Sequence, residues 1–245
     1  MLPRHFLVAL LLLSSAGQVS ASTIRAAVAA NFKTTLDKLA AVYRARTGNT
    51  VEIVSASTGT LYTQIENGAP FDVFLAADSA RPTRLEQSGK GIAGTRFTYA
   101  VGRLALLVPG STNVDKSWLA AFSGRIAIAN PATAPYGQAA VQALKAIDVK
   151  SYTLVVGTNV AQAFQFVDSG SVVAGLVSFS YIKNSSHATR SDYWLVPQQY
   201  YAPIAQQAIM VRNANPDAAS LLKFLKSSQA IAIIVNDGYA ATTEE

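Results

Sequence analysis

Small polar residues recur where an apolar run that reads as a strand passes directly into a helical pattern. The start of a helix carries N–H groups without an intrahelical acceptor, together with the positive end of the helix dipole. In open α/β sheets such helix starts meet at the carboxyl ends of the strands, where ligands bind. Four of them facing one cleft predict a site for a small anion. The segments are Ala30-Asn31, Ser57-Thr58-Gly59, Tyr136-Gly137 and Thr158-Asn159-Val160.

Each segment also has a purely structural interpretation. Asn, Ser and Thr are the preferred N-cap residues of helices, so an N-cap role accounts for each segment without any ligand. The pattern taken alone leaves that alternative open for all four.

An enzyme is a further alternative, and the sequence gives it little support. It contains neither a GxSxG nor a P-loop motif, and no Ser-His-Asp set assembles around His187. His187 lies in a polar stretch and is interpreted as a solvated loop residue. Residues 89–94 match GxGxxG, but they follow a helical segment and precede a strand, the reverse of a dinucleotide site. We therefore expect a binding protein and not an enzyme.

Short apolar runs alternate with helical patterns almost to the end of the chain, which is typical of a parallel sheet with crossover helices. The predicted fold class is α/β. Two extended segments, 99–109 and 200–211, break the rhythm and are interpreted as crossings between lobes. Two lobes that exchange chain twice fit better than two consecutive domains. The expected strands are 23–29, 51–56, 71–76, 104–108, 125–129, 153–156, 172–177 and 204–211.

Helix boundaries are also readable. Gly48 and Gly170 each follow apolar residues at helical spacing and serve as stop signals. Near the C-terminus, Asn215, Pro216 and Asp217 are expected to supply an N-cap, a proline at the first helical position and a first-turn acid.

The N-terminal segment 1–21 has the features of a secretory signal peptide: a basic start at Arg4, a short apolar run and small residues ending at Ala21. Removal of this segment lowers the formal net charge from +6 to +5, because Arg4 leaves with it. The remaining Lys and Arg residues are isolated, which disfavours nucleic-acid binding. The chain has no cysteine, so disulfides, thiolate sites and a lipid anchor are excluded. A free periplasmic protein is expected.

Over nearly the whole segment after residue 21, the sequence resembles the periplasmic molybdate-binding proteins of ABC transporters. That family has the two-lobed type II periplasmic binding fold, in which each lobe is a mostly parallel sheet flanked by helices. The resemblance implies a lobe of residues 22–102 plus 204–245 and a second lobe of residues 103–203. The motifs that carry it are AAVAANF at 26–32, SASTGTLYTQI at 55–65, NGAPFDVFLAAD at 67–78, IANP at 128–131, PYG at 135–137 and TNV at 158–160.

The resemblance assigns the ligand contacts residue by residue. Asn31 matches the donor at the end of the first strand, with Ala30 beside it, and Thr58 matches the second donor, with Ser57 beside it. Tyr136 and Val160 match backbone N–H donors of the second lobe. Where some members carry a ligating tyrosine after Gly-Leu-Val, this chain has Ser178, a shorter side chain for which the Asn31 amide would substitute. The assigned residues are Ala30, Asn31, Ser57, Thr58, Tyr136, Val160 and Ser178.

The implied ligand is molybdate or tungstate, with no cofactor, no bare metal ion and a membrane permease as partner of a monomeric protein. Other oxyanions such as sulfate, and ferric ion, remain alternatives. The ferric alternative rests on the adjacent Tyr200 and Tyr201, since ferric-binding proteins of this broad fold use paired tyrosinates. Asp72 and Asp78 flank a predicted strand and are interpreted as caps of backbone around the cleft.

Overall fold

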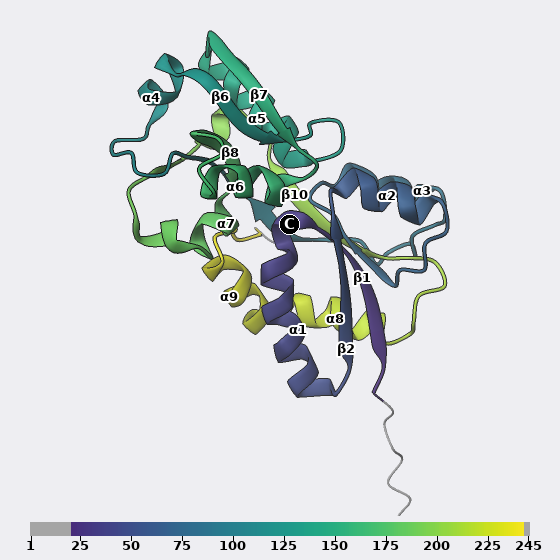
Figure 1. The fold of residues 1–245 in the computed structure, drawn as a ribbon. Helices are drawn as coiled ribbons and strands as arrows, with labels where there is room; N and C mark the ends of the chain where they lie inside the picture. The colour runs from purple at the N-terminus through teal and green to yellow at the C-terminus, as the bar shows by residue number, and fades with distance from the viewer. Residues whose placement is uncertain (1–20, 243–245) are drawn as a thin grey trace, which may run out of the picture.

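The computed structural model describes residues 21–242, so residues 1–20 of the predicted signal peptide lie outside the described residues. The chain folds into two mixed five-stranded sheets, each flanked by helices (Figure 1). We call the first sheet with its helices lobe 1 and the second sheet with its helices lobe 2. The predicted two-lobed α/β fold is confirmed.

In the sheet of lobe 1, four strands run in the same direction and the fifth pairs antiparallel with both of its neighbours. Alternate residues of β1 point to opposite faces of the sheet, so the core of lobe 1 has one part on each face. Ile24, Ala26 and Val28 face α1, α8 and α9, whereas Ala27 faces the opposite side with α2 and α3. The strand order is β2 (Thr50–Ala56), β1 (Thr23–Ala29), β3 (Val73–Leu75), β10 (Ile204–Met210) and β4 (Phe97–Gly102). The helices are α1 (Lys33–Thr47), α2 (Thr58–Glu66), α3 (Ala80–Gln87), α8 (Ala218–Leu225) and α9 (Ser228–Asn236).

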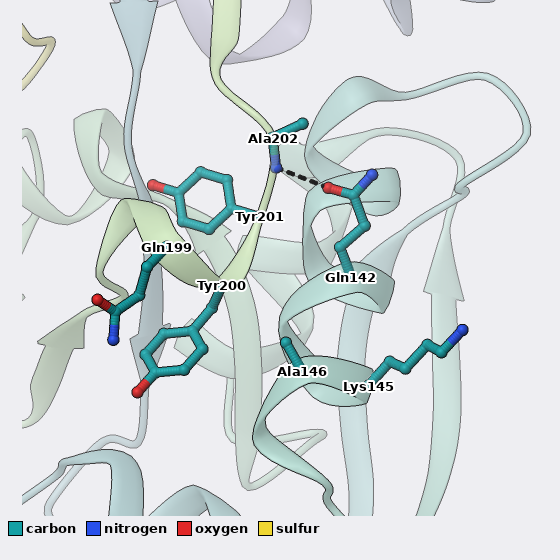
Figure 2. Close-up of a pocket in the computed structure, with 7 residues that line it drawn as sticks. All are labelled: Gln142, Lys145, Ala146, Gln199, Tyr200, Tyr201 and Ala202. Atoms are coloured by element: carbon teal, nitrogen blue, oxygen red, sulfur yellow. Dashed lines mark hydrogen bonds between the residues drawn. The ribbon is translucent and has the colours of Figure 1, made fainter.

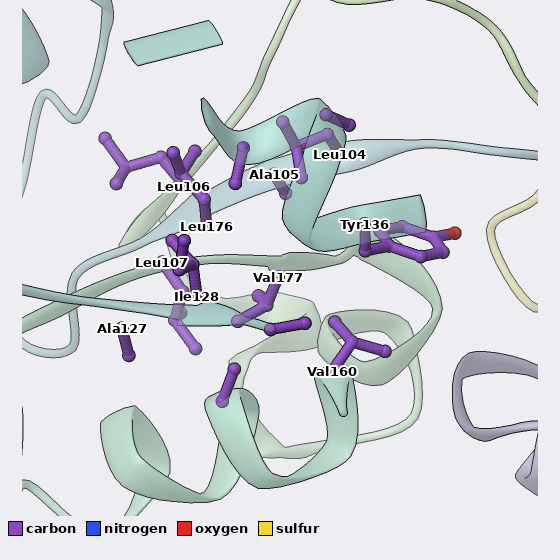
Figure 3. Close-up of a cluster of buried hydrophobic side chains, with 14 of the residues drawn as sticks. Leu104, Ala105, Leu106, Leu107, Ala127, Ile128, Tyr136, Val160, Leu176 and Val177 are labelled. Carbon is purple, nitrogen blue, oxygen red and sulfur yellow. The ribbon is translucent and has the colours of Figure 1, made fainter. Parts of the chain in front are cut away.

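Lobe 2 repeats the same arrangement with its own core, part of which Figure 3 shows. In that view Tyr136 and Val160 lie at the same end of the core. The strand order is β7 (Ser151–Gly157), β6 (Ser123–Ala129), β8 (Ala174–Ser178), β5 (Leu104–Leu107) and β9 (Tyr193–Leu195). The helices are α4 (Lys116–Ala121), α5 (Pro135–Ile147), α6 (Val160–Asp168) and α7 (Phe179–Lys183), and the 3-10 turns are η2 (Ser186–Thr189) and η3 (Gln198–Tyr200). A further 3-10 turn, η1 (Ala30–Phe32), follows β1 in lobe 1.

The chain passes between the two sheets at two places. The extended segment 99–109 is not one strand: β4 pairs in the first sheet and β5 in the second, with only Arg103 between them. The return passage runs from η3 through 201–203 into β10. The local apolar pattern is continuous here because both halves are buried, each in a different core.

The predicted end of α1 is confirmed, whereas the predicted start of the helix near the C-terminus is not. Gly48 adopts the left-handed conformation, φ 77°, directly after α1, which is the conformation that glycine tolerates best. The expected N-cap at Asn215 is wrong, because α8 begins only at Ala218. The Asn215 side chain instead accepts the N–H of Asp217, which makes a turn ahead of the helix.

Within residues 21–242, no single helix has the length and apolar composition to cross a membrane. The α8 and α9 pair meets both criteria only when joined, and it is bent by 65° at the break. Leu221 and Ile234 of this pair are buried in the core of lobe 1, whereas Val235 is exposed.

Candidate functional site

A small cavity lies between the lobes, beyond the carboxyl ends of β1 and β2 in lobe 1 and of β6 and β7 in lobe 2. Its volume is about 10 Å³, which is about the room that one water molecule needs. Among the described residues that line it, none carries a charged side chain. The lining residues are Ala29, Ala30, Asn31, Ser57, Thr58, Ala77, Ala134, Pro135, Tyr136, Asn159 and Val160.

The first wall is the turn η1, which begins immediately after β1. Ala30 and Asn31 are the first two residues of this turn, so their N–H groups have no acceptor within it. No other acceptor in residues 21–242 takes the Asn31 N–H, and Asn31 is only 2% exposed. A buried donor without a partner costs about 1–3 kcal/mol, so a ligand acceptor at this point would be strongly favoured.

The second wall is the start of α2. Ser57 is the N-cap, and its hydroxyl accepts the N–H of Thr60 at 3.3 Å. Thr58, the first helical residue, accepts the N–H of Ala77 on its own hydroxyl at 3.1 Å. That contact uses a lone pair of the Thr58 oxygen, so its hydroxyl hydrogen is available to a ligand. Thr58 therefore offers two donors, the hydroxyl and the backbone N–H.

Lobe 2 contributes two further helix starts. Pro135 occupies the first position of α5, where its missing N–H is no loss, and Tyr136 follows with an N–H that has no intrahelical acceptor. A Cβ on Gly137 would lie 2.2 Å from the Ala129 carbonyl oxygen, so only glycine lets α5 start this close to β6. At α6, Asn159 caps the helix and Val160 presents the next free N–H.

Six of the seven residues assigned from the sequence thus line one cavity, and Ser178 does not. Ser178 is fully buried at the end of β8, where its hydroxyl bonds Ser180 Oγ at 2.8 Å. The Asn31 side-chain amide is also engaged: Nδ2 donates to Gln206 Oε1 at 2.8 Å and to Tyr239 Oη at 3.2 Å. The donor that Asn31 presents to the cavity is therefore its backbone N–H.

Sequence reasoning missed the residues behind this cavity. Gln206 is fully buried in β10 and accepts both the Asn31 amide and the Tyr99 hydroxyl, the latter at 3.0 Å. Tyr239 Oη donates to the Asn31 carbonyl at 2.7 Å. The available signal was a glutamine inside an apolar strand pattern, IAQQAIM, since a buried polar side chain in a strand needs a specific partner.

The hydroxyls around the cavity stay neutral. Burial raises the pKa of the Tyr99 and Tyr136 hydroxyls well above the ordinary value of 10.0, and burial also raises the pKa of Tyr239. A tyrosinate would be desolvated and unpaired there. The electrostatics of the cavity therefore come from N–H groups and helix dipoles, which favour a negatively charged ligand.

Tyr200 and Tyr201 do not form a paired site. They line a shallow groove of about 530 Å³ between α5 and the returning chain, in which their hydroxyls diverge (Figure 2). Tyr201 Oη accepts the Leu104 N–H at 3.0 Å, and the Tyr200 ring packs near Trp194. Within residues 21–242, no group of three or more His, Cys, Asp and Glu side chains is placed to hold a metal ion.

His187 is not a solvated loop residue, contrary to the sequence interpretation. It is 3% exposed, with Nδ1 2.8 Å from Asp192 Oδ2 and Nε2 3.1 Å from Asp168 Oδ1. The polar stretch around it turns inward, and both ring nitrogens lie within hydrogen-bond distance of a carboxylate.

The two acidic residues that flank β3 bind backbone N–H groups. Asp72 accepts the N–H groups of Arg25 and Asn215, each at 2.7 Å, at the end of lobe 1 remote from the cavity. Asp78 accepts the N–H of Arg81 at 2.9 Å near the interlobe face.

Known proteins resemble this chain in sequence and in overall fold. The family model described as bacterial extracellular solute-binding protein matches residues 24–240. The chain belongs to this family. It is 41% identical to the molybdate-binding protein ModA of Azotobacter vinelandii, over 93% of each chain. It is 37% identical to ModA of Rhodobacter capsulatus, over 90% of this chain and 89% of the other. The solved structure of the A. vinelandii periplasmic molybdate-binding protein superposes with a TM-score of 0.84 at 34% identity, covering 90% of this chain and all of that one.

Proposed function

We propose that this protein is the periplasmic solute-binding component of a molybdate or tungstate ABC importer and holds the tetrahedral oxyanion in the interlobe cavity. One observation carries the proposal: four helix starts with unpaired N–H groups, two from each lobe, line a single buried cavity without a charged side chain. The identity to the two ModA proteins supports the choice of ligand.

The donor set suits a fully deprotonated dianion. Every polar group proposed to contact the ligand is a donor, so a proton retained on the ligand would face another donor and find no acceptor. Phosphate near neutral pH is therefore disfavoured. Each hydrogen bond to a charged group contributes about 1.5–3 kcal/mol. Four N–H groups and one hydroxyl together contribute about 7.5–15 kcal/mol, which is set against the cost of association.

The proposed contacts are the N–H groups of Asn31, Thr58, Tyr136 and Val160 and the Thr58 hydroxyl, with Ala30 and Ser57 beside them. Ser178 stays outside this set. The oxyanion docks on one lobe, the crossings near Gly102 and Pro203 bend, and the second lobe closes over it. We take residues 22–102 with 204–245, and residues 103–203, as the two moving bodies. A monomer exported by the signal peptide at 1–21 would deliver the ion to the membrane permease.

A ligand panel tests the function directly. Protein of residues 22–245 is heated with molybdate, tungstate, sulfate, phosphate or ferric ion, and the unfolding temperature is recorded. Molybdate and tungstate are expected to raise it, because a ligand that binds only the folded state stabilises that state. An equal shift with sulfate would refute the selectivity, and a shift with ferric ion together with a visible tyrosinate band would favour the iron alternative.

A further inference from the structure

Helix α7 of lobe 2 packs against η1 of lobe 1. Two hydroxyls of α7 reach across the lobe boundary. Tyr181 Oη donates to the Ala30 carbonyl at 2.7 Å, and Ser180 Oγ donates to the Asn31 carbonyl at 3.1 Å. The anion-binding turn of lobe 1 is thus held from behind by lobe 2.

The Tyr181 contact acts on a proposed ligand donor through a single peptide group. The Ala30 carbonyl and the Asn31 N–H are the two ends of one trans peptide, so they point in opposite directions. Tyr181 holds the carbonyl end, and the N–H end is the one without a protein acceptor beside the cavity. A hydrogen bond to the carbonyl fixes the orientation of the plane and polarises the N–H, which strengthens its bond to an anion.

Tyr181 is itself anchored to the lobe 2 half of the site. Its ring stacks on Phe164 of α6, with centroids 5.3 Å apart, and α6 is the helix that presents Val160 to the cavity. Burial raises the pKa of the Tyr181 hydroxyl, so it remains a protonated donor. Movement of lobe 2 therefore carries the Val160 donor and the Tyr181 hydroxyl together.

We infer that Tyr181 is a positioning residue, an interlobe latch that orients the Asn31 N–H toward the oxyanion when the lobes close. The inference rests on the proposed function and adds to it a residue that does not touch the ligand. Because the latch is a contact between the two lobes, its loss is expected to accelerate ligand release and to leave ligand association and the stability of the ligand-free protein unchanged.

The test compares Tyr181→Phe with the wild-type protein by stopped-flow tryptophan fluorescence, using molybdate and tungstate as probes. Phenylalanine keeps the ring on Phe164 and removes only the donor. Tyr152→Phe, at an exposed tyrosine of β7, is the matched control. Ser180→Ala, which removes the neighbouring interlobe hydrogen bond to the Asn31 carbonyl, is a second variant. One neutral hydrogen bond corresponds to a dissociation rate about 3 to 10 times faster, with the association rate within about twofold.

The outcomes separate the two proposals. Faster release in Tyr181→Phe, with unchanged urea unfolding of the ligand-free protein, supports the latch. Wild-type release rates in both Tyr181→Phe and Ser180→Ala overturn the latch while the function stands. Equal destabilisation of ligand-free and ligand-bound Tyr181→Phe also overturns it, because the contact would then be merely structural. If the wild-type protein binds neither anion, the proposed function and the latch both fail.

Discussion

Replacement of Thr58 by valine separates the two roles of its hydroxyl. Valine keeps the shape and branching of threonine and removes only the oxygen. In the protein, that oxygen accepts the Ala77 N–H at 3.1 Å, and Thr58 is 1% exposed. The Ala77 N–H would be left buried without an acceptor, so we expect the free energy of unfolding of the ligand-free protein to fall by about 1–3 kcal/mol.

The second role concerns the ligand. The Thr58 hydroxyl hydrogen is proposed to bind the oxyanion, and a hydrogen bond to a charged group is worth about 1.5–3 kcal/mol, which corresponds to a Kd about 10 to 150 times weaker. Isothermal titration with molybdate measures this change, and urea unfolding measures the first. Thr63→Val, at an exposed site on the same helix, is the control. A Kd for Thr58→Val within twofold of that of Thr63→Val would refute the assignment of the hydroxyl to the ligand.

Two further substitutions test closure and the buried histidine. A Cβ on Gly59 would lie 3.0 Å from both Cα and O of Thr133 across the cleft, and overpacking costs about 1–3 kcal/mol. Because alanine has a higher helix propensity than glycine, Gly59→Ala should leave the stability of the ligand-free protein intact. Titration should show molybdate binding that is about 5 to 150 times weaker. An unchanged affinity would show that this contact does not limit closure. His187→Leu strands the buried Asp192 carboxylate and should lower the unfolding free energy by about 3–5 kcal/mol in urea, with partial recovery in the double variant carrying Asp192→Asn. A stable His187→Leu protein would contradict the paired arrangement.

The sequence by itself determined the features that depend on local pattern. Short apolar runs predicted most strands of both lobes, although β4 and β9 were not among the expected strands. Glycine marked the end of α1, because the left-handed residue after a helix is a local requirement. The four helix starts of the proposed site were also readable, since each is a short segment at a strand end. The family resemblance then selected one ligand class for them.

Only the tertiary structure decided where long-range contacts direct each polar group. The Asn31 side-chain amide donates to Gln206, 175 residues away, and the Ala30 carbonyl accepts from Tyr181, 151 residues away. The proposed ligand donor of this turn is therefore its backbone N–H, and a residue of lobe 2 holds the turn in place. Likewise, no local sequence pattern indicates that β4 and β5 pair in different sheets. Nor does a local pattern indicate that His187 is buried beside two carboxylates. Periodicity records whether a residue is buried, whereas its partner depends on which elements the fold brings beside it.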